Sequence, residues 1–194
     1  MNITNIQIRL SSKRGSQLAS ASVVIDNAIV LHGIKVMRKK DGETLFVSMA
    51  GRYIKDGHYV DVYYHPSNTQ ARAELCEKVL EAYHKALEDP ETTSFDMGDS
   101  KAEMTVSSIR LYNTVGEALA SVSLVLDDCL VLGMMAIREN RTTGEKWLSM
   151  PTRKMSNGMV KEVFHPISVE AREKLCNAAL RAYQQSEAAM ALAT

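Results

Sequence analysis

The segment that decides the fold occurs twice in this 194-residue chain: residues 71–83 read ARAELCEKVLEAY and residues 171–183 read AREKLCNAALRAY. Their apolar residues recur at spacings of three and four, which is typical of a helix that buries one face. In the first copy the expected apolar face comprises Leu75, Cys76, Val79, Leu80, Tyr83 and Leu87. Asn68 and Ser168 are the predicted N-caps. The sequence therefore predicts two equivalent amphipathic helices.

The similarity continues upstream of both helices as an ordered series of short matches. The matching pairs are Ile8–Leu10 with Ile109–Leu111, Leu18–Ser22 with Leu119–Ser123, Val30-Leu31 with Val131-Leu132, Ser48-Met49 with Ser149-Met150, and His65-Pro66 with His165-Pro166. So many matches in the same order indicate a tandem duplication rather than chance.

Strand patterns precede the helix in each copy. Apolar residues alternate with polar ones up to Leu10, and two longer runs rich in β-branched residues flank Asp26-Asn27, a predicted hairpin turn. The expected strands after the first are Leu18–Ile25, Ala28–Arg38, Leu45–Met49 and Tyr59–Tyr64, with Lys146–Met150 and Met159–Phe164 matching the last two. Each copy thus predicts an α+β unit, an antiparallel sheet followed by one C-terminal helix.

The domain boundaries follow from the repeat and from charge. The first repeat is assigned to residues 1–88 and the second to residues 104–187, with a C-terminal tail at 188–194. The linker, residues 89–103, is acidic. A unit of about 85 residues has a marginal core of its own. We therefore expect the two repeats to pack on each other as an intrachain pseudo-dimer.

Composition excludes several classes of protein. The chain is 45% hydrophobic and 24% charged with a formal net charge of zero, a globular composition without a global attraction to nucleic acid. No apolar run approaches the roughly 18 residues of a membrane helix, and no signal-peptide core is present. Three cysteines without a CxxC or His pairing argue against a disulfide framework and a metal site. We expect a cytoplasmic protein without a membrane partner.

The second copy carries a recognisable string of motifs. Leu148–Lys154, Asn157-Gly158, His165–Ile167 and Glu170–Arg172 follow one another in an order that resembles the stage V sporulation protein G (SpoVG) family. The first copy departs from it, because residues 49–53 lack the Pro and the Lys of the Met-Pro-Thr-Arg-Lys segment and keep only the Arg.

The resemblance implies a small regulator that forms dimers, binds DNA or RNA, and is linked to septation and sporulation control. It implies neither a cofactor nor a catalytic activity. Because the chain holds two copies, the resemblance also implies that one chain supplies both halves of the family's dimer.

Basic residues near turns are the candidate nucleic-acid contacts. Arg153 and Lys154 follow a strand and precede a turn, and Arg52 is their counterpart in the first copy. Arginine offers a fork of donors to phosphate and lysine a point charge. The tips of two predicted hairpins could extend this surface through Arg38, Lys39, Lys40, Arg138 and Arg141. For all eight the alternative is a solvated turn.

The other conspicuous residues have simpler structural interpretations. Arg9 and Arg110 are expected to pair with acids across the sheet, although a nucleic-acid contact stays open for them. Arg72 and Arg172 are expected in ion pairs. His65 and His165 lack a recurring nucleophile beside them, so each is interpreted as a corner histidine making one hydrogen bond. Cys76 and Cys176 are expected in the core, and the tyrosines Tyr53, Tyr59, Tyr63 and Tyr64 in sheet packing rather than base stacking.

These patterns leave two classes of function open. One is a SpoVG-like nucleic-acid-binding regulator, and the other is a protein-interaction or scaffold module that makes no nucleic-acid contact. The zero net charge and the diverged first copy suit the second class. An enzyme is not expected, because no phosphate-cradling glycine loop, metal-ligand cluster or nucleophile elbow is present.

Overall fold

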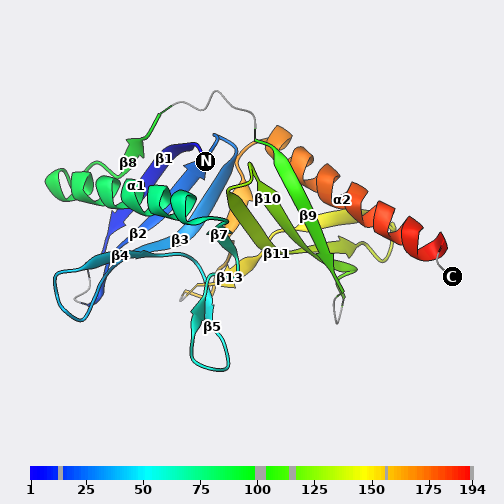
Figure 1. The fold of residues 1–194 in the computed structure, drawn as a ribbon, viewed down its shortest axis with the longest axis horizontal. Helices are drawn as coiled ribbons and strands as arrows, with labels where there is room; N and C mark the ends of the chain where they lie inside the picture. Colours follow the sequence, from blue (N-terminus) through cyan, green and yellow to red (C-terminus); the bar gives the residue numbers. More distant parts are fainter. Residues whose placement is uncertain (13–14, 99–103, 114–116, 156, 193–194) are drawn as a thin grey trace.

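The computed structural model describes residues 1–12, 15–98, 104–113, 117–155 and 157–192, which form two α+β repeats (Figure 1). The first repeat consists of β1 (Ile3–Leu10), β2 (Gln17–Ile25), β3 (Ile29–Arg38), β4 (Leu45–Ser48), β5 (Arg52–Tyr53), β6 (Tyr59–Val60), β7 (Tyr64–Pro66) and α1 (Thr69–Glu88). The linker contributes β8 (Ser94–Asp96). The second repeat consists of β9 (Val106–Tyr112), β10 (Ala120–Leu126), β11 (Leu130–Glu139), β12 (Lys146–Ser149), β13 (Thr152–Lys154), β14 (Val160–Glu162), β15 (Phe164–Pro166) and α2 (Val169–Leu192).

The turns between the two longest strands of each repeat are those that the sequence predicts. Asp26 and Asn27 have φ values of 53° and 49°, and Asp127 and Asp128 have 47° and 54°. Two successive residues in the left-handed region make the tight hairpin turn that matches strand twist, and Asp and Asn tolerate that region better than most residues. The β2–β3 and β10–β11 hairpins are therefore fixed locally.

The two repeats exchange their last strands. β7 of the first repeat pairs antiparallel with β11, with His65 opposite Val131, and β15 of the second pairs with β3, with His165 opposite Val30. Backbone bonds extend both ladders, from Gly133 N to Tyr63 O at 2.7 Å and from His32 N to Val163 O at 2.8 Å. The expectation of an intrachain pair is confirmed, and the shared sheets are its physical basis.

This exchange corrects the prediction of one continuous strand at Tyr59–Tyr64 and at Met159–Phe164. Each predicted strand is divided in two: the first part closes a small hairpin, β5–β6 or β13–β14, and the second part crosses to the other repeat. The alternation of side chains is the same in either sheet, so the local pattern could not reveal the crossing.

One hydrophobic core runs through both repeats. At its centre Tyr64 and Phe164, both fully buried, meet edge to face with ring centroids 6.4 Å apart. The Tyr64 hydroxyl donates to His32 O at 2.7 Å, which satisfies its polar end in the interior. Each swapped strand thus brings one aromatic ring to the junction, and neither repeat completes its core alone.

Both helices begin at the predicted caps. Asn68 Oδ1 accepts from Ala71 N at 2.8 Å, and Ser168 Oγ accepts from Ala171 N at 3.1 Å. The predicted apolar face of α1 is corrected at its end, because Leu87 is 51% exposed and Ala86 is buried in its place.

The structure also adds order where the sequence predicted a linker and a tail. β8 lies within the acidic segment and pairs with β1, and α2 continues to Leu192 through most of the residues assigned to the tail.

The first strands of the repeats differ in register. Gln7 lies opposite Ser22 on β2, whereas Arg110 lies opposite Ser123, the β10 residue that matches Ser22. Arg110 therefore takes the place of Gln7 and not of Arg9, its match in sequence. A shift of two residues keeps every side chain on its original face of the sheet, so the apolar pattern permits both registers.

Candidate nucleic-acid interface

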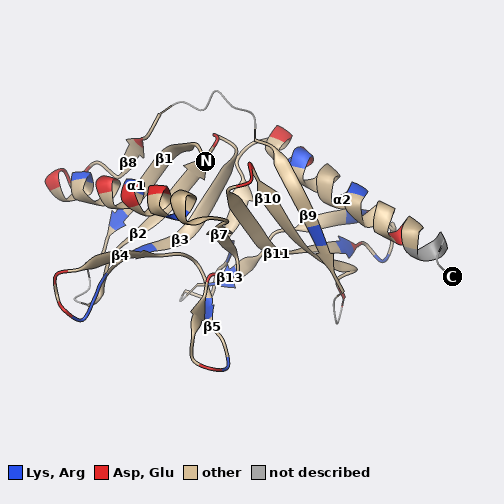
Figure 2. Cartoon of the chain, in the orientation of Figure 1, with Lys and Arg blue, Asp and Glu red and all other residues tan. Residues whose placement is uncertain are grey.

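Two small hairpins, β5–β6 and β13–β14, leave the molecule where the two sheets meet (Figures 1 and 2). Each connects the last strand of one sheet with the strand that crosses into the other. A Cβ at Gly51 would lie 2.2 Å from Val60 O, so only glycine permits the close approach that starts the first hairpin. Pro151 occupies the corresponding turn of the second repeat, where its carbonyl accepts from Val163 N at 2.8 Å.

The β13–β14 hairpin carries an unusual arrangement of positive charge. Arg153 lies directly opposite Lys161, and both are exposed, as is Lys154. Like charges opposite each other weaken a strand pair. The nearby carboxylate of Glu162 lies 3.9 Å from Arg172, and none of the three basic residues is in a salt bridge within the described chain. An external anion is therefore the natural counter-charge for this hairpin.

The β5–β6 hairpin presents an aromatic ring beside two basic residues. Tyr53 is 75% exposed and meets Tyr59 edge to face at 5.2 Å. The Tyr59 hydroxyl donates to Met49 O at 2.9 Å, which anchors that ring as a support for Tyr53. The predicted sheet packing holds for Tyr64 and for the Tyr53–Tyr59 contact across the hairpin, but the Tyr53 ring is largely exposed as well. Arg52 and Lys55 are exposed on the same hairpin.

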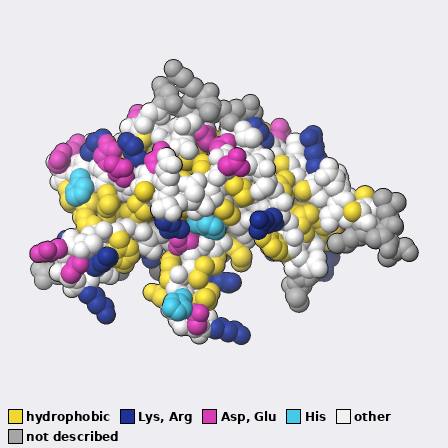
Figure 3. Space-filling model, in the orientation of Figure 1, with side chains coloured by type: hydrophobic (Ala, Val, Ile, Leu, Met, Phe, Trp, Pro, Cys, Tyr) yellow, Lys and Arg dark blue, Asp and Glu magenta, His cyan; other side chains and the backbone are white. Residues whose placement is uncertain are grey.

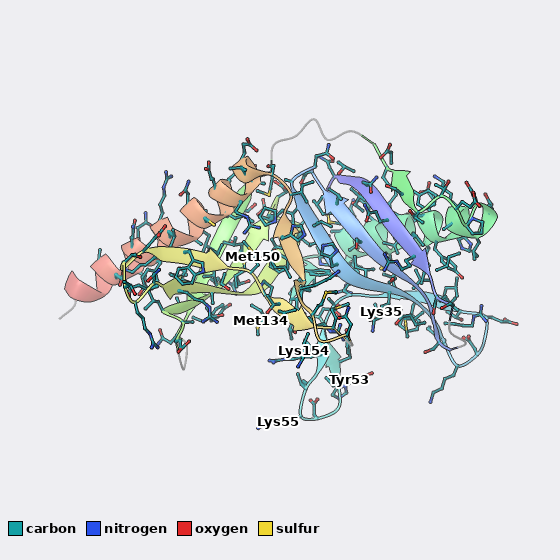
Figure 4. All side chains as sticks on the ribbon, turned by 180° about the vertical axis from the view of Figure 1, so that it is seen from behind. Lys35, Tyr53, Lys55, Met134, Met150 and Lys154 are labelled. Carbon is teal, nitrogen blue, oxygen red and sulfur yellow. The ribbon has the colours of Figure 1, made fainter. Side chains whose placement is uncertain are left out.

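Figure 4 shows Lys154, Tyr53 and Lys55 below the junction of the two sheets. In the space-filling view the β5–β6 hairpin protrudes from the body and has charged and histidine side chains at its tip (Figure 3). The major groove of duplex DNA is wide enough to admit a two-stranded β-ribbon of this kind.

The other predicted basic residues are not brought to this place. Arg38, Lys39 and Lys40 lie where β3 turns into β4, at the opposite end of β3 from the swapped strand. Arg141 is bound to Glu117 at 3.0 Å, and Arg138 is half-buried opposite Trp147. The structure therefore groups Arg52, Arg153 and Lys154 near the junction and leaves the hairpin tips apart.

The remaining arginines are also placed. The expected ion pairs of the helices are confirmed: Arg72 binds Asp61 at 3.0 Å and Arg172 approaches Glu162 at 3.9 Å. The acid partners expected for the strand arginines are not found in the described part of the chain. Arg9 lies exposed opposite Ser20, and Arg110 lies opposite Ser123, because serines occupy the facing positions of β2 and β10.

The two corner histidines have different surroundings. His65 Nδ1 lies 3.2 Å from Asp61 O, the single bond that the sequence predicts. His165 makes a second contact that the sequence did not predict, because its Nε2 lies 3.2 Å from Nε2 of His32. Gly133 holds the position of His32 in the second repeat, so this pair forms at one of the two junctions.

The proton positions in this pair follow from its partners. Pro166 O can only accept, so His165 Nδ1, at 3.0 Å, carries a proton and its Nε2 accepts from His32. His32 Nδ1 then accepts from the Ser22 hydroxyl at 2.9 Å. Burial lowers the pKa of His32, and the nearby His165 and Lys161 lower it further. The His32 ring is therefore neutral in the stable form of this junction.

The cysteines lie where the sequence places them. Cys76 and Cys176 pack against the core, and burial raises the pKa of both thiols. Within the described residues no group of three or more His, Cys, Asp or Glu side chains is arranged to hold a metal. Neither α1 nor the described part of α2 has an apolar stretch of the length needed to cross a bilayer.

Sequence reasoning missed Lys161 and the exposure of Tyr53. The Asn157-Gly158 turn could have revealed Lys161, because counting outward from this turn along both strands places Lys161 opposite Arg153. No comparable signal distinguishes exposed Tyr53 from its buried relative Tyr64.

Two α+β repeats that exchange strands and carry a basic hairpin at each exchange define an intrachain version of a symmetric dimer. Comparison with known proteins gives the family. The SpoVG family model matches residues 1–85 and 103–185, and the chain belongs to the SpoVG family.

Single-repeat relatives match half of the chain each. The proteins named "Putative septation protein SpoVG" are 45% identical over 86 residues in Lachnospira eligens, 39% over 89 residues in Clostridium beijerinckii and 40% over 88 residues in Archaeoglobus fulgidus. These matches cover 94%, 94% and 96% of the relatives but only 44%, 46% and 42% of this chain. The chain thus has the length of two such proteins.

Proposed function

We propose that this chain is a nucleic-acid-binding regulator that holds DNA or RNA with the two hairpins at its junction. The observation that carries the proposal is the opposition of Arg153 and Lys161 without a carboxylate partner. A phosphate placed between them would convert a repulsive pair into two charge-assisted contacts.

The exposed ring of Tyr53 supports the same proposal from the other repeat. An aromatic face can stack on any base of a single strand, which contributes about 1–3 kcal/mol per base. Arg52 and Lys55 flank it on the same hairpin and could contact the backbone. The diverged first copy would then add base stacking, while the second copy adds phosphate contacts.

The proposal includes a role in septation and sporulation control, after the name of the relatives and the resemblance of the motifs. It includes no catalytic step and no cofactor. It places the protein where nucleic acid is accessible, in the cytoplasm.

The test is titration of labelled single-stranded and duplex oligonucleotides with the full chain at several salt concentrations. We expect binding that weakens as salt rises, because each phosphate contact releases counterions. Replacing Arg153 and Lys154 by Ala should weaken binding by roughly 1–3 kcal/mol, and Arg52→Ala should cost less because one charge is removed. Absence of binding to any oligonucleotide at low salt would overturn the proposal.

The second candidate is a protein-interaction module. It is favoured by an open strand edge on the second repeat, far from the hairpins in Figure 1. The two surfaces do not exclude each other.

A further inference from the structure

The outer edge strands of the two repeats differ in whether another strand pairs with them. In the first repeat β8 covers the edge of β1, with Phe95 opposite Ile6 and Asp96 opposite Asn5. Backbone bonds from Ile8 N to Thr93 O at 2.8 Å and from Met97 N to Thr4 O at 3.0 Å extend this pairing. Phe95 and Met97 pack against the core, whereas Ser94 and Asp96 bond to Asn5 on the opposite face.

The matching edge of the second repeat is open. β9 pairs with β10 on one side, and no described residue pairs with its other side. Ile109 faces Leu124 as Ile6 faces Val23, so it holds the place that Phe95 covers in the first repeat. Ile6 is fully buried, but Ile109 and Leu111 are only half-buried. An uncovered edge is a template for another strand.

A groove lies beside this edge on the side of the core. Between β9 and α2 there is a cavity of about 400 Å³, lined by Thr105, Val106, Lys174, Asn177, Ala178 and Arg181. The comparable space between β1 and α1 measures about 160 Å³, and Met97 and Gly98 of the linker lie against it. The segment that narrows the first groove has no counterpart over the second among the described residues.

The charge of the helix beside the groove differs between the repeats. Where α1 has Glu74, Lys78 and Glu81, α2 has Lys174, Ala178 and Arg181, so these positions carry mixed charge in α1 and only positive charge in α2. On the other face of the sheet Arg110 is exposed where β1 has Gln7. An added strand would therefore meet positive charge on both faces, and opposite charges across a strand pair are stabilising.

We propose that the β9 edge and its groove are a docking site for an extended acidic segment of a partner protein. The segment pairs antiparallel to β9, as β8 does to β1. It sets an apolar side chain opposite Ile109 into the groove and an acidic side chain opposite Arg110. Backbone hydrogen bonds along the edge give affinity, and the alternating side chains give specificity.

A second copy of this chain fits the edge less well. If β9 paired with β9 of a second copy about a two-fold axis, the two grooves would lie next to each other. Each groove would bring its own Lys174 and Arg181 to this contact. Like charges brought together in this way oppose association.

The probe is a labelled synthetic peptide with the sequence of residues 89–98 carrying Ser94→Asp, DPETTDFDMG, so that an aspartate lies opposite Arg110 when Phe95 lies opposite Ile109. It is titrated into the full chain and followed by fluorescence anisotropy. In the full chain β8 already covers the edge of β1, so the peptide can pair only with the uncovered edge of β9 among the described strands of these two sheet edges. We expect saturable binding, with amide NMR shifts at Ile109 and Leu111 rather than at Ile6 and Ile8. A peptide with Ser in place of Phe95 should bind at least fivefold more weakly.

Charge reversal on the protein locates the site. Arg110→Glu and, independently, Arg181→Glu should weaken peptide binding about fivefold or more, since each turns an attraction into a repulsion. Arg9→Glu is the matched control, because Arg9 is an exposed arginine on the covered strand β1, and it should leave binding unchanged. Circular dichroism confirms that each variant is folded.

Four results would overturn the proposal. The first is no peptide binding at millimolar concentration, and the second is NMR shifts confined to β1. The third is a mass of twice 21.5 kDa in light scattering that falls to the mass of one chain in Arg110→Glu. That result would mean that the β9 edge binds a second copy of this chain. The fourth is loss of oligonucleotide binding in Arg110→Glu with unchanged peptide binding, which would give this surface to nucleic acid.

Discussion

Removal of Lys161 should affect stability and binding in opposite directions. Arg153 and Lys161 are directly opposite each other on an exposed two-stranded hairpin. Two unit charges about 7 Å apart in water repel by about 0.6 kcal/mol. Lys161→Ala should therefore stabilise the hairpin of the free protein by about that amount at low salt, and less at 1 M salt, where the Debye length is about 3 Å.

Hydrogen exchange measures this effect where it arises. Met155 N donates to Met159 O at 2.7 Å across the hairpin, so its exchange reports hairpin opening. A gain of about 0.6 kcal/mol slows exchange about threefold when opening is in fast equilibrium. The same variant should bind an oligonucleotide about tenfold more weakly, the low end for a charged hydrogen bond, and its salt slope should fall by about 0.7 on a single strand.

The reciprocal change is available in the first repeat. Arg52 lies opposite Val60, which is 39% exposed, so Val60→Lys recreates the like-charge pair at little cost in burial. It should weaken the β5–β6 hairpin and strengthen oligonucleotide binding. Faster exchange at Met155 in Lys161→Ala would refute the reasoning, because Lys161 would then stabilise the hairpin and have a structural role.

Three further predictions concern the fold. The pKa of His32 lies below its ordinary value of 6.5 in the folded protein, so the unfolded chain binds more protons as the pH falls. The free energy of unfolding should therefore be largest above pH 6.5 and fall as the pH drops toward the lowered pKa. The urea midpoint of the His32→Gln variant should fall less over the same pH range than that of the wild type. Met134 has a φ of 61° at the position where the first repeat has Gly33, and its side chain is 46% exposed. Met134→Gly should therefore raise the thermal midpoint, because it relieves about 1 kcal/mol of backbone strain. An unchanged or lower midpoint would contradict this. Phe164→Ala should cost about 3–5 kcal/mol in urea unfolding while the transition stays single, and two separate transitions in the wild type would contradict a shared core.

The parts of the fold that the sequence predicts are those fixed by neighbours along the chain. The Asp26-Asn27 turn and the Asn68 cap depend on residues within a few positions, and both are confirmed. The exchange of β7 and β15 depends on which distant strand offers an edge, and the same alternating pattern serves either sheet. The duplication predicted that the repeats pair but gave no means of choosing the surface.

The candidate site also has features that the sequence predicts and features that only the structure reveals. Arg153 and Lys154 are recognisable because a short motif surrounds them, but their relation to Lys161 depends on register across a turn. From the sequence, the basic tips were candidates to extend the surface around Arg153 and Lys154. In the structure Arg141 is bound to Glu117, a residue 24 positions away that composition alone could not assign to it.

The salt dependence of oligonucleotide binding tests the central claim most directly. The slope of log Kd against log salt is measured for the wild type, for the hairpin variant in which Arg153, Lys154 and Lys161 are Ala, and for the tip variant in which Arg38, Lys39 and Lys40 are Ala. Each triple variant removes three charges, so non-specific electrostatics change equally. With a single strand, the slope of the hairpin variant should fall by about two units and that of the tip variant should be unchanged. Equal reductions in the two variants, or a larger one for the tip variant, would contradict a binding surface at the junction.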